Sequence, residues 1–244
     1  MKRPLVLVMA LVACLAYASS AHAAVLTFNQ GIDLWLSSSG TQDTGNPNLG
    51  WGRNLGVNAR NYDSLIKFTD MFGAGDDQIP LESTINSATL YIWIGYDGYD
   101  GGLTSSIYQM TYDWNATSTW FTIGSTGGIV PGVNAEASPE LQWTGTSNAW
   151  SQRAFDLTPS VQDWSDGAGQ YGWGFTRDRY RAVTALSLDY STPSYRPYLV
   201  VDFTPPPPTP DPIPEPSTLT IFGVELCTWV ALKRRRKGFF RKTA

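Results

Sequence analysis

Cysteine and histidine are nearly absent from this chain of 244 residues. The one histidine, His22, and the two cysteines, Cys14 and Cys227, lie near the two ends, so residues 24–204 contain neither type. This stretch therefore forms no disulfide, offers no His/Cys zinc site, and supports neither a Ser-His-Asp triad nor a cysteine nucleophile. Carboxylate, tyrosine, lysine or arginine chemistry stays open, as does calcium binding by oxygen atoms.

Basic residues are also scarce in residues 24–204, which hold 8 of them against 18 acidic residues and so carry a net charge of −10. The whole-chain charge of −4 hides this imbalance, because the other basic residues gather at the two ends. An acidic surface repels the phosphates of nucleic acids, so we expect no nucleic-acid partner.

Long apolar runs are confined to the two ends of the chain. At the N-terminus, Lys2 and Arg3 precede an apolar stretch at 5–18, which is followed by Ala21 and Ala23. A basic head, a short apolar core and small residues before the cut are typical of a secretory signal peptide, so we predict that signal peptidase removes residues 1–23. The alternative is an uncleaved anchor, but the apolar core is shorter than the ~20 residues that span a bilayer.

The C-terminal end has four parts in sequence. A proline-rich linker at 205–213 is followed by a Pro-Glu-Pro triplet at 214–216, an apolar run at 219–232 and a basic tail at 233–242. The apolar run would form ~21 Å of helix, which is short for a bilayer core of ~30 Å. It also contains Glu225, whose charge is costly in a membrane. We therefore predict a short transmembrane sorting helix that anchors the chain transiently in the inner membrane, with the basic tail in the cytoplasm.

This arrangement resembles the PEP-CTERM sorting signal of Gram-negative bacteria. The residues that carry the resemblance are Pro214, Glu215, Pro216, Arg234, Arg235 and Arg236. The resemblance implies that an exosortase-type membrane peptidase recognises residues 214–244 and removes them. It also implies delivery to the cell surface, or secretion into an exopolysaccharide or biofilm matrix.

Strand patterns dominate the body of the chain, residues 24–204. The strongest lies at 88–96, where Ile92 and Ile94 alternate with Trp93 and Gly95, so that the two sets face opposite sides of a sheet. About ten short strands separated by turn residues predict one all-β domain, a jelly roll or two-sheet β-sandwich. We predict the other strands at 25–28, 32–36, 55–57, 64–68, 107–112, 120–123, 153–157, 171–176, 185–189 and 198–203, loops at 37–52 and 70–81, and one helical turn at 158–164 with Thr158 as N-cap.

Several motifs of the body resemble the DNRLRE domain, a family related to a class of carbohydrate-binding modules. The motifs SLIKF at 64–68, GDDQIP at 75–80 and STINSATL at 83–90 come first, and FDLT at 155–158 and RPYLVV at 196–201 follow in the family's order. The resemblance implies a β-jelly-roll that binds glycans. The segment 115–145 is longer than the family pattern, so no ligand loop is carried over to it.

Sugar binding requires flat aromatic faces and side chains that hydrogen-bond hydroxyl groups. The aromatic candidates in predicted loops are Trp51, Tyr96, Tyr99, Trp120 and Trp143. Each could instead cover an edge of the core. Trp93 and Trp173 fall on strand patterns, and we expect them in the core.

Arginines at alternate positions form a second candidate feature. Arg177, Arg179 and Arg181 would project from one face of a strand. Their guanidinium groups could bind uronic-acid carboxylates in a bidentate manner. The alternative is a solvated edge strip that deters pairing between strands of different molecules.

Aspartates in glycine-rich loops are the only candidate metal ligands. Asp97 and Asp100 could bind a structural calcium ion through oxygen atoms, as could the Asp76-Asp77 pair. The alternative is ordinary turn chemistry, in which such side chains bond to their own backbone. No other cofactor is expected.

The sequence thus predicts a non-catalytic, exported protein that binds a polysaccharide through a β-sandwich. One alternative is a passive structural component of a surface or matrix. Another is a small carbohydrate-active enzyme, which would need two carboxylates ~5–10 Å apart in a cleft.

Overall fold

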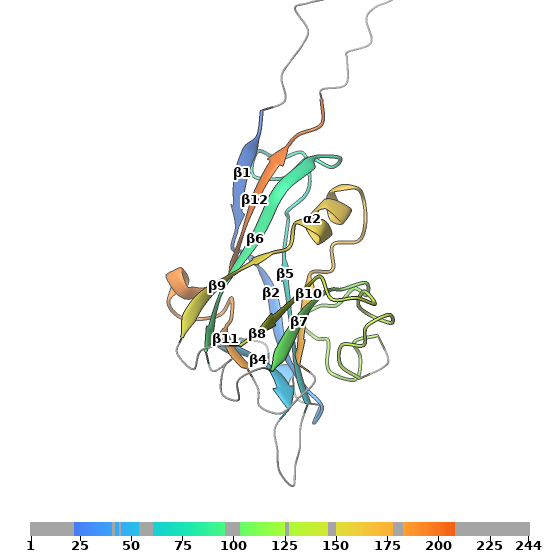
Figure 1. Ribbon diagram of the computed structural model, residues 1–244, viewed down its shortest axis with the longest axis vertical. Coiled ribbons are helices and arrows are strands. Elements are labelled where there is room, and N and C mark those ends of the chain that lie inside the picture. The colour runs from blue at the N-terminus through green and yellow to red at the C-terminus, as the bar shows by residue number, and fades with distance from the viewer. Residues whose placement is uncertain are drawn as a thin grey trace, which may run out of the picture. The chain divides into compact units, whose positions relative to one another are not determined.

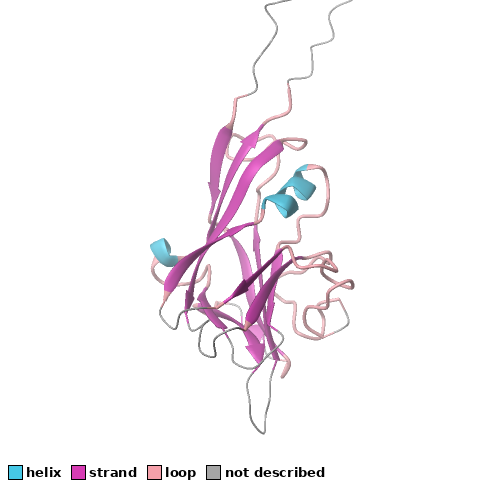
Figure 2. Ribbon diagram, viewed as in Figure 1, coloured by secondary structure: helices cyan, strands magenta, loops and turns pink. Residues whose placement is uncertain are grey.

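The computed structural model describes residues 22–40, 42–43, 45–53, 61–95, 103–124, 127–145, 150–177 and 183–207. The described residues up to Pro206 belong to one compact unit. Figure 2 shows that strands and loops make up most of it. The fold is all-β, as the alternating sequence patterns predict.

Two kinds of element build the unit. The strands are β1 (Ala24–Phe28), β2 (Gly31–Ser37), β3 (Gln42–Asp43), β4 (Asn48–Arg53), β5 (Asn61–Phe68), β6 (Thr84–Gly95), β7 (Thr104–Gln109), β8 (Leu141–Thr144), β9 (Ser151–Asp156), β10 (Trp173–Arg177), β11 (Val183–Leu186) and β12 (Tyr198–Thr204). The helical elements are α2 (Thr158–Ser165) and the short 3-10 helix η1 (Pro193–Tyr195). All strand pairs between these elements are antiparallel.

The first sheet is organised around the long strand β6. β9 pairs with residues 89–94 of β6 along one edge. β11 and β12 share the other edge, where Ala185 pairs with Ile94 and Tyr198 pairs with Tyr91. The chain leaves the sheet between these two strands, and we call residues 187–197 the excursion. β1 pairs with β12 and β4 with β11, which completes the sheet (Figure 1).

The second sheet contains β2, β3, β5, β10, β7 and β8. β4 joins the two sheets, because its Trp51 pairs with Val183 of β11 and its Gly52 pairs with Tyr62 of β5. The predicted loop at 37–52 is therefore wrong over its last part, which is a buried strand. At Gly50 a Cβ atom would lie 3.2 Å from the Trp35 indole, so glycine lets Trp35 pack closely on this strand.

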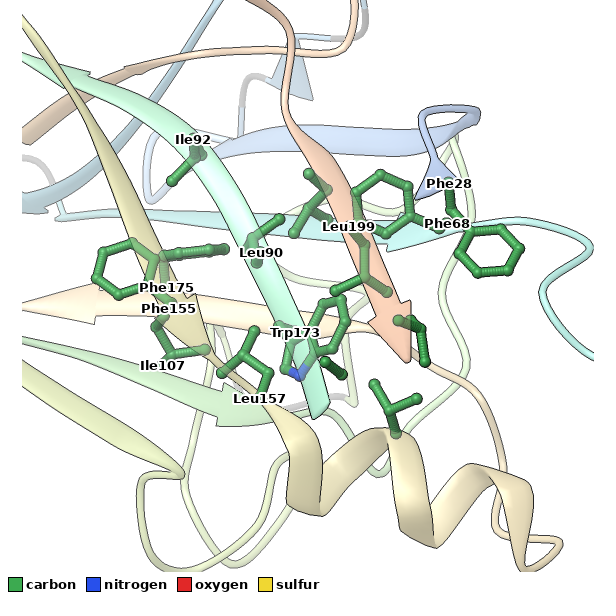
Figure 3. Packing of buried hydrophobic residues seen from close by; sticks show 14 of the residues in the cluster. Phe28, Phe68, Leu90, Ile92, Ile107, Phe155, Leu157, Trp173, Phe175 and Leu199 are labelled. Atoms are coloured by element: carbon green, nitrogen blue, oxygen red, sulfur yellow. The ribbon is translucent and has the colours of Figure 1, made fainter. Parts of the chain in front are cut away.

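The core lies between the inner faces of the two sheets. Leu90 and Ile92 of β6 enter it from one side and Trp173 and Phe175 of β10 from the other, and all four are fully buried (Figure 3). Burying side chains of this size contributes roughly 1.5–3 kcal/mol each. In β6 these residues alternate with the half-buried Tyr91 and Trp93, and this alternation fixes which face of the strand turns inward.

The segment 111–140, which we call the cover, packs on the outer face of the second sheet. Its Trp114, Ile123 and Ile129 are buried against Leu34 and Leu65 of that sheet. The predicted strand at 120–123 is wrong, because these residues form turns. The side chains of Trp120 and Ile123 pack in the cluster on this sheet, while the backbone of these residues stays outside the strand ladder.

Helix α2 follows β9 and starts one residue earlier than predicted. Thr158 is its first residue and not its N-cap, and Pro159 follows. The Thr158 hydroxyl donates to the Asp156 carboxylate at 2.6 Å and accepts the Ala88 N–H at 2.9 Å. These bonds tie the start of the helix to β6, which explains why the side chain does not cap its own helix.

Both predicted targeting segments fall outside the described residues. These are the apolar stretch 5–18 and the sorting segment 214–244. Within the ranges that the structure describes, no helix is long and apolar enough to cross a membrane. The first strand begins at Ala24, the residue that directly follows the predicted cleavage site.

Candidate functional site

Trp93 stands on the outer face of the first sheet. Its neighbours in β6, Ile92 and Ile94, are buried in the core. Because successive side chains of a strand point to opposite faces, the Trp93 ring lies on the outer side and is half-buried there. The expectation that Trp93 belongs to the core is therefore corrected, and the outward face of β6 becomes the base of a site.

The excursion brings two tyrosines to this tryptophan. The Tyr195 ring meets the Trp93 ring edge-on, with centroids 5.0 Å apart and planes at 71°. Tyr190 lies 6.3 Å from Tyr195, centroid to centroid. Such tilted arrangements are the favoured geometry of aromatic pairs. Figure 1 shows the short helix η1 of the excursion standing beside β9.

A second tryptophan belongs to the same aromatic group. Trp150 precedes β9, and its indole lies directly over Gly95 at the end of β6. A Cβ atom at position 95 would be 2.7 Å from the indole carbons, which is too close for any side chain. Glycine is therefore required for this contact. The Trp150 ring remains 42% exposed, as does the Tyr195 side chain.

These side chains enclose a hollow of about 320 Å³, which we call the aromatic hollow. It is lined by Asn48, Trp93, Trp150, Leu186, Tyr190 and Tyr195. The described lining residues offer ring faces for stacking and phenol and amide groups for hydrogen bonding, and none of them is a carboxylate. The Trp93 indole N–H is buried and has no hydrogen-bond partner in the described part of the chain.

The start of the excursion is held in place by a buried carboxylate. The Leu188 N–H donates to Asp33 Oδ2 of β2, and burial raises the pKa of Asp33 to about 7. The Ser187 hydroxyl donates to the Asn46 carbonyl at 2.6 Å. Near its end, Arg196 Nε donates to the Tyr190 carbonyl at 2.7 Å. The start of the excursion is thus tied to other parts of the chain, and the Arg196–Tyr190 bond closes the excursion on itself, which preorganises its tyrosines.

Two predicted binding residues are buried and are corrected. Trp51 is fully buried in β4, where its ring lies 5.0 Å from that of Phe175 and its Nε1 donates to Ser105 Oγ. Arg177 is 6% exposed and its Nε donates to the same Ser105 hydroxyl at 3.1 Å. Both side chains turn inward between the sheets, so neither presents a face to a sugar.

Other predicted site residues fall outside the described ranges. These are Tyr96, Tyr99, Arg179, Arg181, Asp97, Asp100 and the sorting-motif residues Pro214, Glu215, Pro216, Arg234, Arg235 and Arg236. Among the residues that are described, no group of three or more His, Cys, Asp or Glu side chains could hold a metal ion. Asp76 and Asp77 lie exposed in a turn.

The remaining predicted aromatics have structural contacts. Trp143 is half-buried, and its ring centroid lies 4.7 Å from that of Phe155 in the opposite sheet. Trp120 packs against the cluster beneath the cover. Trp173 is buried in the core, as predicted.

Sequence reasoning missed Trp150, Tyr190 and Tyr195. Two features of the sequence could have pointed to them. Tyr91, Trp93 and Gly95 share one face of a strand, and the loop before β12 is rich in tyrosine. Comparison with known proteins adds no assignment: no family model matches the chain, and no curated protein matches it.

Proposed function

We propose that this protein is a non-catalytic binding module that holds a polysaccharide in the aromatic hollow. The proposed fold type is a jelly-roll β-sandwich of the kind that the DNRLRE resemblance implies. The observation that carries the proposal is the grouping of two tryptophans and two tyrosines around one surface hollow. Aromatic ring faces stack on the C–H faces of pyranose rings, and the phenol and amide groups bond to hydroxyls.

The exposure of the rings supports binding over a purely structural role. Trp150 and Tyr195 each keep 42% of their surface exposed, although both already make aromatic or backbone contacts. A core residue would be covered completely. The described lining residues include no carboxylate, and their ring faces, phenols and amide suit stacking and hydrogen bonding.

Removing one exposed ring should weaken binding strongly. We expect Tyr195→Ala to raise the dissociation constant at least tenfold, about 1.4 kcal/mol, because aromatic anchors dominate such sites. Gly95→Ala should have a similar effect, since the new methyl group displaces the Trp150 indole. Tryptophan fluorescence titrations with xyloglucan, dextran, xanthan and polygalacturonate would give the dissociation constants.

The matched control is Tyr112→Ala. Tyr112 is 45% exposed, like Tyr195, but belongs to the cover on the second sheet. Its replacement should leave the dissociation constant unchanged. Equal losses in Tyr112→Ala and Tyr195→Ala would contradict the location of the site. Absence of binding by the unaltered protein would favour the passive structural role.

We further propose that the protein is exported and sorted to the surface of a Gram-negative cell, or secreted into its matrix. The signal peptide at the N-terminus and the PEP-CTERM-like tail support this. Signal peptidase and an exosortase-type peptidase would be its processing partners.

The exported protein should then have lost both ends. We expect intact-mass and terminal-peptide mass spectrometry to find Ala24 as its first residue and to find no peptide from 219–242. Recovery of full-length chain outside the cell would overturn the processing scheme, and it would leave the binding proposal intact.

A further inference from the structure

A second hollow lies on the far side of η1. It measures about 210 Å³ and is open to solvent. Its polar lining groups are Thr27, Asn29, Gln30, Ser194 and Arg196. We call it the polar hollow after its amide, hydroxyl and guanidinium groups, which lie among apolar lining atoms.

The two hollows are neighbours on one face of the first sheet. η1 separates them: its Pro193 and Ser194 line the polar hollow, and its Tyr195 lines the aromatic one. Beneath this ridge, Tyr198 lines the polar hollow and stacks on Tyr91 at 4.8 Å and 13°. Tyr91 and Trp93 share the outward face of β6, so the aromatic surface continues from one hollow to the other.

Arg196 connects the two hollows chemically. Its Nε donates to the Tyr190 carbonyl, on the side of the aromatic hollow, while the side chain also lines the polar one. No described carboxylate forms an ion pair with Arg196. In a body of net charge −10, the described lining of the polar hollow thus holds a cation and no anion, and its guanidinium keeps donors for an incoming oxygen.

We infer that the two hollows are adjacent subsites of one surface, which binds an internal stretch of a glycan chain and not a single sugar or a chain end. This inference rests on the proposed function. The aromatic hollow would stack one sugar ring, and the polar hollow would bond to hydroxyl or other oxygen atoms of sugars further along the chain. Because both hollows are open, the chain can continue beyond each of them.

Chain length tests the inference directly. Isothermal titration with cello-oligosaccharides and with oligogalacturonates, from the disaccharide to the octasaccharide, provides a neutral and an acidic ladder. In the ladder that binds, we expect the octasaccharide to bind at least tenfold more tightly than the disaccharide. Tighter binding of the oligogalacturonates would indicate that Arg196 bonds to carboxylates, and tighter binding of the cello-oligosaccharides would indicate that it bonds to hydroxyls.

A variant of the polar hollow alone separates the two subsites. In Asn29→Ala/Gln30→Ala, two exposed side chains are lost and the aromatic hollow is untouched. We expect octasaccharide affinity to fall at least tenfold and disaccharide affinity to stay within about twofold. The matched control, Asn86→Ala, removes an exposed amide from β6 that lines neither hollow.

Two results would overturn the inference, and they differ from failure of the proposed function. If the disaccharide binds as tightly as the octasaccharide, the site holds a single sugar. If the double variant binds the octasaccharide normally, the polar hollow is not a subsite. In either case sugar binding itself would stand, whereas a protein that binds no member of either ladder and no polysaccharide would contradict both proposals.

Discussion

The protein is expected to lose stability as the pH rises from about 4 to about 7. Two buried aspartates cause this. Burial raises the pKa of Asp33 to about 7, with a smaller contribution in the same direction from Asp189. Burial likewise raises the pKa of Asp63 to about 7, although the Ile129 N–H and Arg53 oppose the shift.

The direction follows from proton counting. In the unfolded chain both carboxyls have a pKa near 3.8, the ordinary value for aspartate. Between about pH 4 and pH 7 the folded protein therefore holds protons that the unfolded chain releases, so the free energy of unfolding falls with rising pH. Burial also raises the pKa of Glu140 and adds to the same trend. The total loss should be on the order of several kcal/mol.

Urea unfolding at a series of pH values measures this slope. The double variant Asp33→Asn/Asp63→Asn keeps an oxygen acceptor for the Leu188 and Ile129 N–H groups and removes the titrating acids. Its unfolding free energy should depend much less on pH. Stability that rises over the same interval, or an unchanged slope in the double variant, would contradict the account.

The second large effect is expected from Asn134→Leu. The Asn134 side chain is fully buried and bonds to three backbone groups of the cover: it accepts the Val130 N–H at 2.7 Å and donates to the Ile123 and Gly128 carbonyls at 3.0 and 2.9 Å. A buried backbone group left without a partner costs about 1–3 kcal/mol. We expect the cover to be destabilised by at least about 3 kcal/mol.

Hydrogen exchange resolves where this loss occurs. The Ile129 and Val130 amides should exchange at least roughly a hundredfold faster in Asn134→Leu, while the amides of β6 and β12 change less. Asn86→Leu is the control, because its exposed amide bonds only to Asp202 and Thr204. That change should stay within about 0.5 kcal/mol. Uniform acceleration of all amides would show that the cover is not a separate unit.

The strands with clear alternation were predictable from the sequence. In β6 the buried Ile92 and Ile94 alternate with Trp93, and in β12 the buried Leu199 and Val201 alternate with Tyr198 and Val200. Both strands have one face in the core, so their pattern has the period of a half-buried sheet. The alternation predicted that Trp93 and Ile92 lie on opposite faces of β6, but it did not tell that the Trp93 face lies outside the core.

Strands and loops with turn-like composition were not predictable in the same way. β4 contains Gly50 and Gly52, and its glycines allow close packing beneath Trp35 instead of marking a loop. In the cover, Gly128 has a φ of 72° and lies against Trp120 and Asp63. The apolar residues of the cover resemble a strand in sequence, but their contacts with the second sheet decide their conformation.

The candidate site depends on contacts that no local pattern contains. Trp93 in β6 and Trp150 directly before β9 reach the hollow at the same end of the β6–β9 pair. Tyr190 and Tyr195 reach it from a loop about a hundred residues from Trp93. Arg177 shows the converse case. Its alternation with neighbouring arginines predicts an exposed strip, yet Ser105 provides a buried acceptor that draws it inward.

Affinity gel electrophoresis tests directly whether the aromatic hollow binds polysaccharide. The purified protein and Tyr195→Ala would be run side by side in gels with and without xyloglucan, dextran, xanthan or polygalacturonate. We expect at least one polysaccharide to retard the unaltered protein. In that gel, Tyr195→Ala should migrate almost as it does without polysaccharide. Equal retardation of both proteins would place binding elsewhere, and no retardation in any gel would contradict the claim that the aromatic hollow binds polysaccharide.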